Sequence, residues 1–107
     1  MQDKTTVKIL PEDKVKLTQD QKNLIELAFD KQVPPEDARF IEKVKTESKN
    51  GENTFARLSQ YFTDKYGPDF GMIYLSAIMG GKEKYEETVE SIESLKALDR
   101  IKNNKLN

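Results

Sequence analysis

Apolar side chains in the middle of the chain recur at intervals of three and four residues: Phe55, Leu58, Phe62 and Tyr66. This spacing places them along one face of an α-helix, and such a helix is stable only when that face is covered. Gly67 and Pro68 follow at once, and neither residue continues a helix readily. The stretch that ends at Tyr66 is therefore predicted to be an amphipathic helix, capped by Asn53 or Thr54 and packed on other helices.

Similar signals predict four more helices, separated by short connections. Thr18 and Gln21 have the spacing of a capping box, which starts the first of them, and Pro34 ends it at Val33. The others are expected from Pro35 to a cap at Lys49-Asn50-Gly51, from Phe70 to Met79, and from about Lys82 to Lys102. The stretch before Gly80-Gly81 is apolar nearly all round, so we expect it at the centre of a bundle.

The N-terminal residues have a different pattern. Apolar and polar side chains alternate over residues 5–17 on either side of Pro11-Glu12-Asp13, which is typical of a β-hairpin. A single hairpin is marginally stable unless it packs on something, so a loose arm is the alternative. We expect an extended arm or hairpin over 1–17, a helical domain over 18–102 and a frayed tail over 103–107.

The length and composition favour one domain. The chain has 107 residues, close to the commonest domain size, and 36% of them are hydrophobic. Globular domains more often have about 45–50%, so much of this chain must face water. The predicted fold class is all-α, or nearly so: a compact bundle of about five short helices with an extended N-terminal segment.

The chain contains neither cysteine nor histidine. It therefore forms no disulfide and has no thiolate nucleophile, and it lacks the commonest general base and metal ligand. Ser59, Ser76 and Thr54 have no recognisable activating partner in the sequence. We expect a protein that is not an enzyme, with no catalytic residue, no cofactor and no metal.

Two motifs resemble ligand sites without completing them. Gly80-Gly81-Lys82 resembles a phosphate-binding loop, but Ser76 and Glu83 occupy the positions where that loop needs glycine and Ser or Thr. Five glutamates follow, between Glu83 and Glu93, and suggest a carboxylate metal site. Di-iron sites in helical bundles need Glu-x-x-His pairs, however, so a solvated face near a helix N-terminus explains these residues better.

Nucleic-acid binding is the alternative function. The predicted second helix carries four basic residues: Arg39, Lys43, Lys45 and Lys49. Acidic residues interrupt them, and the net charge of the chain is −1. A small regulator that uses these basic residues is therefore the second hypothesis, and a protein partner is preferred over nucleic acid.

Surplus apolar surface points to a protein partner. Met72, Leu75 and Met79 lie on one side of the fourth predicted helix, and Leu95, Leu98 and Ile101 rotate away from Tyr85 late in the fifth. Tyr61 lies at the edge of the Phe62 stripe, and tyrosine is enriched at binding hot spots. Either the N-terminal segment (Val7, Ile9, Val15 and Leu17) covers this surface or another chain does.

The leading hypothesis is a non-enzymatic protein-interaction module: an adaptor, an inhibitor or an immunity-type protein. It would bind a protein partner, or a second copy of itself, through an apolar patch on the last two helices. The first residues lack the apolar core of a signal peptide, and the longest mostly apolar stretch is about half of what a membrane span needs. A cytoplasmic location without membrane contact is therefore expected.

Overall fold

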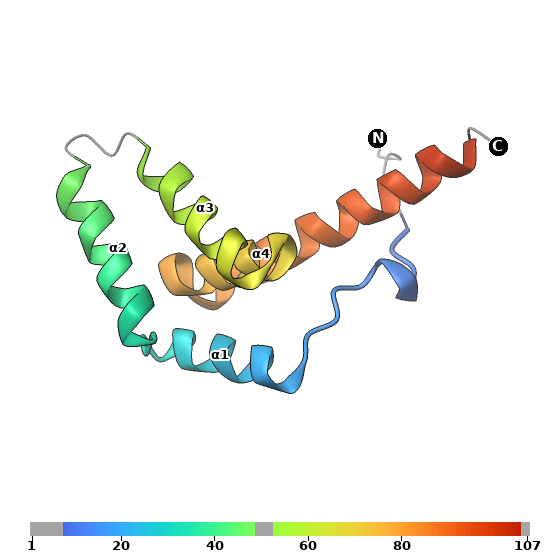
Figure 1. Cartoon of the computed structure of the whole chain (residues 1–107). Coiled ribbons are helices and arrows are strands. Elements are labelled where there is room, and N and C mark those ends of the chain that lie inside the picture. The colour runs from blue at the N-terminus through green and yellow to red at the C-terminus, as the bar shows by residue number, and fades with distance from the viewer. Residues whose placement is uncertain (1–7, 49–52, 106–107) are drawn as a thin grey trace.

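The computed structural model of the chain describes residues 8–48 and 53–105 (Figure 1). These residues form a short 3-10 helix, η1 (Pro11–Asp13), and four α-helices. The α-helices are α1 (Gln19–Phe29), α2 (Pro35–Glu47), α3 (Thr54–Tyr66) and α4 (Pro68–Lys105). Both described ranges are free of β-strand, so the all-α prediction is confirmed for them.

Local signals set several helix ends where the sequence predicts them, but the prediction that Pro34 ends the first helix at Val33 is wrong, because α1 already ends at Phe29 and Lys31 has a positive φ of 62°. The Thr18 hydroxyl accepts a hydrogen bond from the Gln21 amide, and the Gln21 side chain accepts one from the Thr18 amide. Pro35 occupies the first turn of α2, where a missing amide proton costs nothing. The cap predicted at Lys49-Asn50-Gly51 lies outside the described residues, and α2 ends at Glu47.

The fourth and fifth predicted helices join into one element, so the prediction of five separate helices is wrong in number. Within α4 the backbone leaves helical geometry at Gly81, with φ 74° and ψ −160°. Glycine adopts a positive φ without the steric cost that other residues incur. The helix resumes at the next residue rather than after a loop, and the break divides α4 into an amino-terminal segment (68–80) and a carboxyl-terminal segment (82–105).

The buried core draws on all four helices. Its members are Ile25, Ala28, Ile41, Val44, Leu58, Phe62, Phe70, Ile73, Tyr74, Leu75 and Ala77. Five of them come from the stretch that the sequence places at the centre of the bundle, and Tyr74 and Ile73 are fully buried. That part of the prediction is confirmed, because a helix that is apolar nearly all round needs neighbours on several sides.

A close crossing of α3 and α4 depends on Gly71. A methyl group at this position would lie 2.5 Å from the carbonyl oxygen of Phe62 and 2.6 Å from the Cα of Thr63. Both distances are far below van der Waals contact, so only glycine allows the two backbones to approach this closely. Figure 1 shows α3 crossing the amino-terminal segment of α4.

The described N-terminal residues form a strap along the carboxyl-terminal segment of α4, and the hairpin prediction is wrong for them. Asp13 caps the η1 turn by accepting a hydrogen bond from the Leu10 amide at 3.0 Å. The Val15 amide donates to the Glu93 carboxylate at 3.0 Å instead of to a neighbouring strand. Side chains on α4 thus satisfy the polar groups that a second strand would have paired. Val7 lies outside the described residues.

Candidate protein-binding surface

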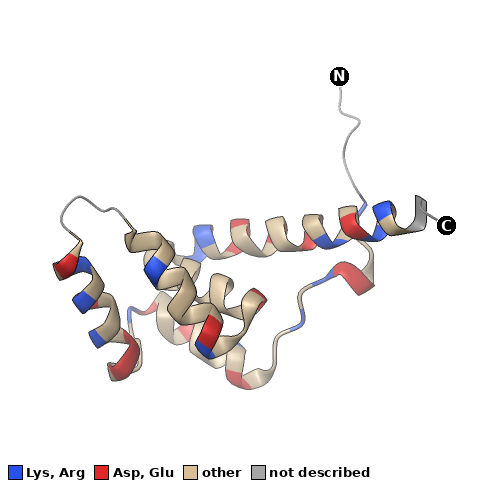
Figure 2. Cartoon of the chain, turned by 45° about the horizontal axis from the view of Figure 1, so that its top comes forward, with Lys and Arg blue, Asp and Glu red and all other residues tan. Residues whose placement is uncertain are grey.

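The carboxyl-terminal segment of α4 extends beyond the other helices, and of the described residues the strap lies beside its end (Figures 1 and 2). One side of this segment is covered: Ala97 is fully buried, and Tyr85, Val89 and Ile92 pack against the core. The opposite side carries three exposed apolar residues, which we call the α4 stripe. They are Leu95, Leu98 and Ile101, with 65%, 48% and 38% of their surfaces exposed.

Helix geometry explains why these three residues stay uncovered. Each residue turns the helix by about 100°, so a step of three residues falls about 60° short of a full turn. Two such steps carry the stripe around to the side opposite Tyr85 and Val89. The strap contacts Glu93 and Arg100 on the covered side. The strap as described therefore does not act as the lid that the sequence suggested for the α4 stripe.

A second apolar feature is a groove between the start of α3 and both segments of α4, with a volume of about 540 Å³. Phe55 and Met79 line it and are 66% and 48% exposed, whereas Leu58 and Leu75 are buried. Phe55 was expected in the buried stripe of its helix, but it lies in the first turn of α3, at the edge of this groove. We call this feature the α3–α4 groove.

The break at Gly81 shapes the groove. It brings Thr88 of the carboxyl-terminal segment within 2.6 Å of Ser76 in the amino-terminal segment, so the two hydroxyls share a hydrogen bond. Gly80, which has no side chain, lies against the aliphatic part of Lys84. A smaller hollow adjoins the groove, shares Met72, Lys84 and Thr88 with it, and reaches Ser91. Leu95 of the α4 stripe follows Ser91 by one helical turn.

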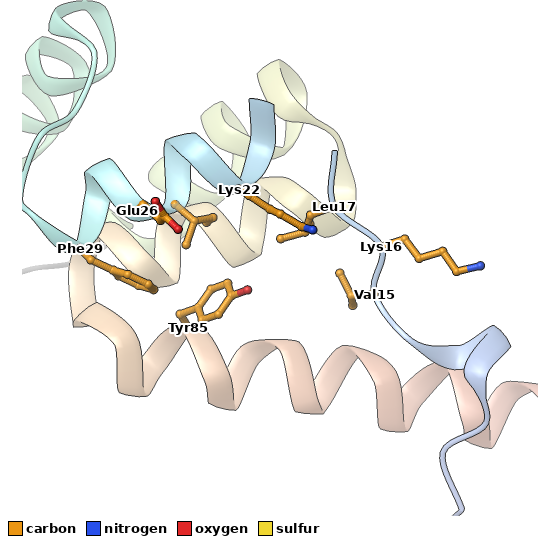
Figure 3. A pocket seen from close by; sticks show the side chains of 8 residues that line it. Val15, Lys16, Leu17, Lys22, Glu26, Phe29 and Tyr85 are labelled. Atoms are coloured by element: carbon orange, nitrogen blue, oxygen red, sulfur yellow. The ribbon is translucent and has the colours of Figure 1, made fainter. Parts of the chain in front are cut away.

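A third feature, a cleft of about 550 Å³, lies between the strap, α1 and the carboxyl-terminal segment of α4 (Figure 3). Phe29 and Tyr85 meet edge to face at one end, with ring centroids 5.4 Å apart. Lys22 extends across the opening toward Leu17, and Lys16 points away from it. Five of the eight residues that line the cleft are aliphatic or aromatic, and the other three, Lys16, Lys22 and Glu26, are charged.

The structure separates the residues that the sequence grouped as one binding patch. Met72, Leu75 and Met79 line the α3–α4 groove, although Leu75 forms part of the buried core rather than open surface. Leu95, Leu98 and Ile101 form the α4 stripe. Tyr61 lies with neither group, because its ring stacks on Phe40 at a centroid distance of 4.1 Å, between α2 and α3.

A buried cluster around Asp37 is the main feature that the sequence did not reveal. This α2 carboxylate is fully buried and accepts hydrogen bonds from the Tyr61 hydroxyl at 2.7 Å and the Tyr66 hydroxyl at 2.5 Å. Lys65 lies 2.7 Å from Asp37 and 2.6 Å from Glu36. Asp37 and Glu36 also lie in the first turn of α2, at the positive end of its helix dipole. The spacing of Tyr61, Lys65 and Tyr66 on one helix is the signal that could have suggested a shared partner.

The electrostatics of the Asp37 cluster favour a fixed ion pair. Burial opposes the charge on Asp37, but the hydrogen bonds from Lys65, Tyr66 and Tyr61 outweigh burial and hold the pKa of this carboxyl below its ordinary value. The hydrogen bonds to Asp37 and Glu36 raise the pKa of Lys65. Burial, followed by the bond to Asp37, raises the pKa of Tyr66. Groups held this firmly in one charge state connect α2 to α3 and are poorly suited to transfer protons near neutral pH.

The basic residues of the nucleic-acid alternative do not form one patch. Arg39, Lys43 and Lys45 are exposed, but Lys45 lies on a different side of α2 from the other two. Figure 2 shows acidic and basic positions mixed along α2. Lys49 lies outside the described residues.

Within residues 8–48 and 53–105, no three His, Cys, Asp or Glu side chains gather closely enough to hold a metal ion. Every helix in the same ranges is too short or too polar to cross a lipid bilayer. The chain matches no family model, no curated protein and no solved structure. Its function must therefore be inferred from its own surfaces.

Proposed function

We propose that this chain is a non-enzymatic protein-interaction module that receives a segment of a partner protein in the α3–α4 groove. One observation carries the proposal: Phe55 and Met79, both large and about half or more exposed, flank a groove with the buried residues Leu58 and Leu75 in its lining. Grooves of this kind bind the apolar face of an amphipathic helix, whose anchor residues recur every three or four positions.

The chemistry of the groove defines the partner further. Its lining is largely apolar, and Met72 and Met79 are flexible side chains that adapt to differently shaped anchors. Lys84 is the charged residue in the lining, beside the small hydroxyls of Ser76 and Thr88. Lys84 already pairs with Glu87 of the same chain at 3.3 Å, so a complementary segment is defined by leucine-like or aromatic anchors. An adaptor or an inhibitor would use such a groove.

Site-specific crosslinking tests this proposal, because the chain contains no cysteine. Met79→Cys would carry a benzophenone label at the groove, and Leu27→Cys would carry the same label on α1, where Leu27 has a comparable exposure of 43%. Illumination in native extract is expected to link a defined protein to the Met79 position and not to the Leu27 position. The purified partner should then bind Phe55→Asp at least about tenfold more weakly than the unaltered chain.

Two results would refute the groove as the binding site. One is equal crosslinking at both labelled positions, which indicates random encounters. The other is a purified partner whose affinity is the same for Phe55→Asp and the unaltered chain. Circular dichroism of each variant confirms that the helices persist, so loss of binding is not confused with loss of fold.

A further inference from the structure

The uncovered side of the carboxyl-terminal segment of α4 has an ordered charge pattern. Glu87 lies near its amino end, Lys102 lies near its carboxyl end, and both are exposed. Leu95 and Leu98 lie between them. At about 100° per residue, all four side chains fall within about 80° of one another around the helix axis. They define a single face with Glu87 at one end, two leucines in its middle and Lys102 at the other end, and Glu87 also pairs with Lys84 of the same chain at 3.3 Å.

Small residues share this face with the leucines. Ser91 and Ser94 lie four residues before Leu95 and Leu98 respectively, and four residues is about one helical turn. A short side chain leaves a shallow space in which a large side chain from another helix can insert. The face therefore supplies both the projections and the spaces that close helix packing needs.

We propose that two copies of this chain associate antiparallel along this face. With the two-fold axis between positions 94 and 95, Leu95 faces Ser94 of the second copy and Leu98 faces Ser91 of the second copy. The same alignment places Glu87 opposite Lys102 of the second copy, and the symmetry repeats each of these contacts. A parallel, in-register pair would instead place glutamate against glutamate and lysine against lysine, so the charges select the antiparallel arrangement.

The expected association is weak. The paired region, residues 87–102, is about 24 Å long at 1.5 Å per residue, and a single pair of helices this long buries less surface than a standard interface. The dimer should therefore form at concentrations of roughly 10–500 µM rather than at nanomolar concentration. This association goes beyond the proposed function, because it uses Leu95 and Leu98 of the α4 stripe, whereas the α3–α4 groove is lined mainly by α3 and the amino-terminal segment of α4.

Charge exchange across the symmetry axis provides a sharp test. Glu87→Lys alone and Lys102→Glu alone each place like charges together twice, and each should weaken dimerisation about tenfold at low salt. The double variant with both changes restores opposite charges and should dimerise as the unaltered chain does. A mixture of the two single variants should also form a mixed dimer. Sedimentation equilibrium measures all four samples.

A second pair of variants tests the apolar centre. Leu98→Asp should leave only monomer, and Leu27→Asp, which changes a similarly exposed leucine on α1, should leave dimerisation unchanged. The proposal is overturned if the unaltered chain stays monomeric up to about 500 µM, a range that covers interfaces of this size. It is also overturned if Leu98→Asp still dimerises, or if the double charge variant stays as weak as the singles. Glu87 and Lys102 are exposed, so the charge variants keep the fold, and the test does not depend on Leu98→Asp folding.

Discussion

The Tyr66 hydroxyl of α3 donates a hydrogen bond to the buried Asp37 carboxylate of α2 at 2.5 Å. Lys65, the neighbour of Tyr66 in sequence, neutralises the same carboxylate from 2.7 Å. A buried carboxylate is stable only when its charge and its acceptor sites are satisfied, and α3 satisfies both. These contacts join α2 to the rest of the fold, since α2 lies against α3 rather than against α1 or α4.

Replacing Tyr66 by phenylalanine should destabilise the protein by about 1.5–3 kcal/mol, because it removes a hydrogen bond to a charged, buried acceptor. The matched control is Tyr74→Phe. The Tyr74 hydroxyl is buried and has no hydrogen-bond partner among the residues that the structure describes. Its removal should change the free energy of unfolding by less than about 1 kcal/mol, with a gain expected rather than a loss. Urea denaturation of both variants measures the difference, and equal losses would contradict the assignment of Asp37 as the acceptor.

Low pH should reduce the stability of the folded protein, because Asp37 then becomes protonated. Its pKa is lowered in the folded state, so its contribution to stability is complete above about pH 4, the usual pKa of an unfolded aspartate, and is lost as the pH falls through the lowered value. Asp37→Asn should reduce the stability at pH 7 by about 1–3 kcal/mol, since Lys65, Tyr61 and Tyr66 lose a charged acceptor while Lys65 keeps its pair with Glu36. The variant should also depend less on pH between about 2 and 5 than the unaltered chain does. Chemical denaturation at a series of pH values tests this, and identical pH profiles would contradict it.

Alanine at Gly71 should destabilise the fold by about 1–3 kcal/mol, because the new methyl group forces the backbones of α3 and α4 apart. Alanine at Gly81 should destabilise the fold by a similar amount, but for a different reason. Among the described residues, the two chain neighbours aside, no atom lies within 4 Å of the added methyl group there, but the positive φ of Gly81 is strained for any residue with a side chain. Thermal denaturation measures both variants, and Gly67→Ala, which also has a positive φ in open space, is the comparison for Gly81.

Breaking the link between Arg100 and the strap should free the strap and leave the bundle folded. Arg100 bonds the Asp13 carboxylate at 2.9 Å and the Lys8 carbonyl at 3.1 Å, and its hydrogen bonds lower the pKa of Asp13. Arg100→Gln should therefore speed amide hydrogen exchange over residues 8–17, whereas exchange in α3 stays slow. Lys102→Gln removes a nearby charge of the same sign. It is expected to change amide exchange neither in the strap nor in α3. Unchanged exchange in the strap of the Arg100 variant would show that apolar packing of Val15 and Leu17 holds it.

Sequence reasoning succeeded where the cause is local. The capping box at Thr18, the helix start at Pro35 and the change of direction at Gly81 all follow from the conformational preferences of a few adjacent residues. The directions in which the α4 stripe residues point around the helix axis could also be predicted from the sequence. The spacing of Leu95, Leu98 and Ile101 determines these directions on any α-helix. Local preferences could not show that two predicted helices join without a loop. A glycine at a positive φ can be followed either by a loop or directly by another helix.

Tertiary structure decided which of these surfaces stay open. The strap pairs with Glu93 and Arg100 rather than with a second strand, and that choice depends on side chains about eighty or more residues away along the chain. The Asp37 cluster likewise requires α2 and α3 to meet, which no short-range pattern specifies. The sequence by itself determined the helices and their apolar faces, because these depend on interactions over one or two turns. Only the packing of distant segments determined which of those faces were covered and which remained exposed to solvent.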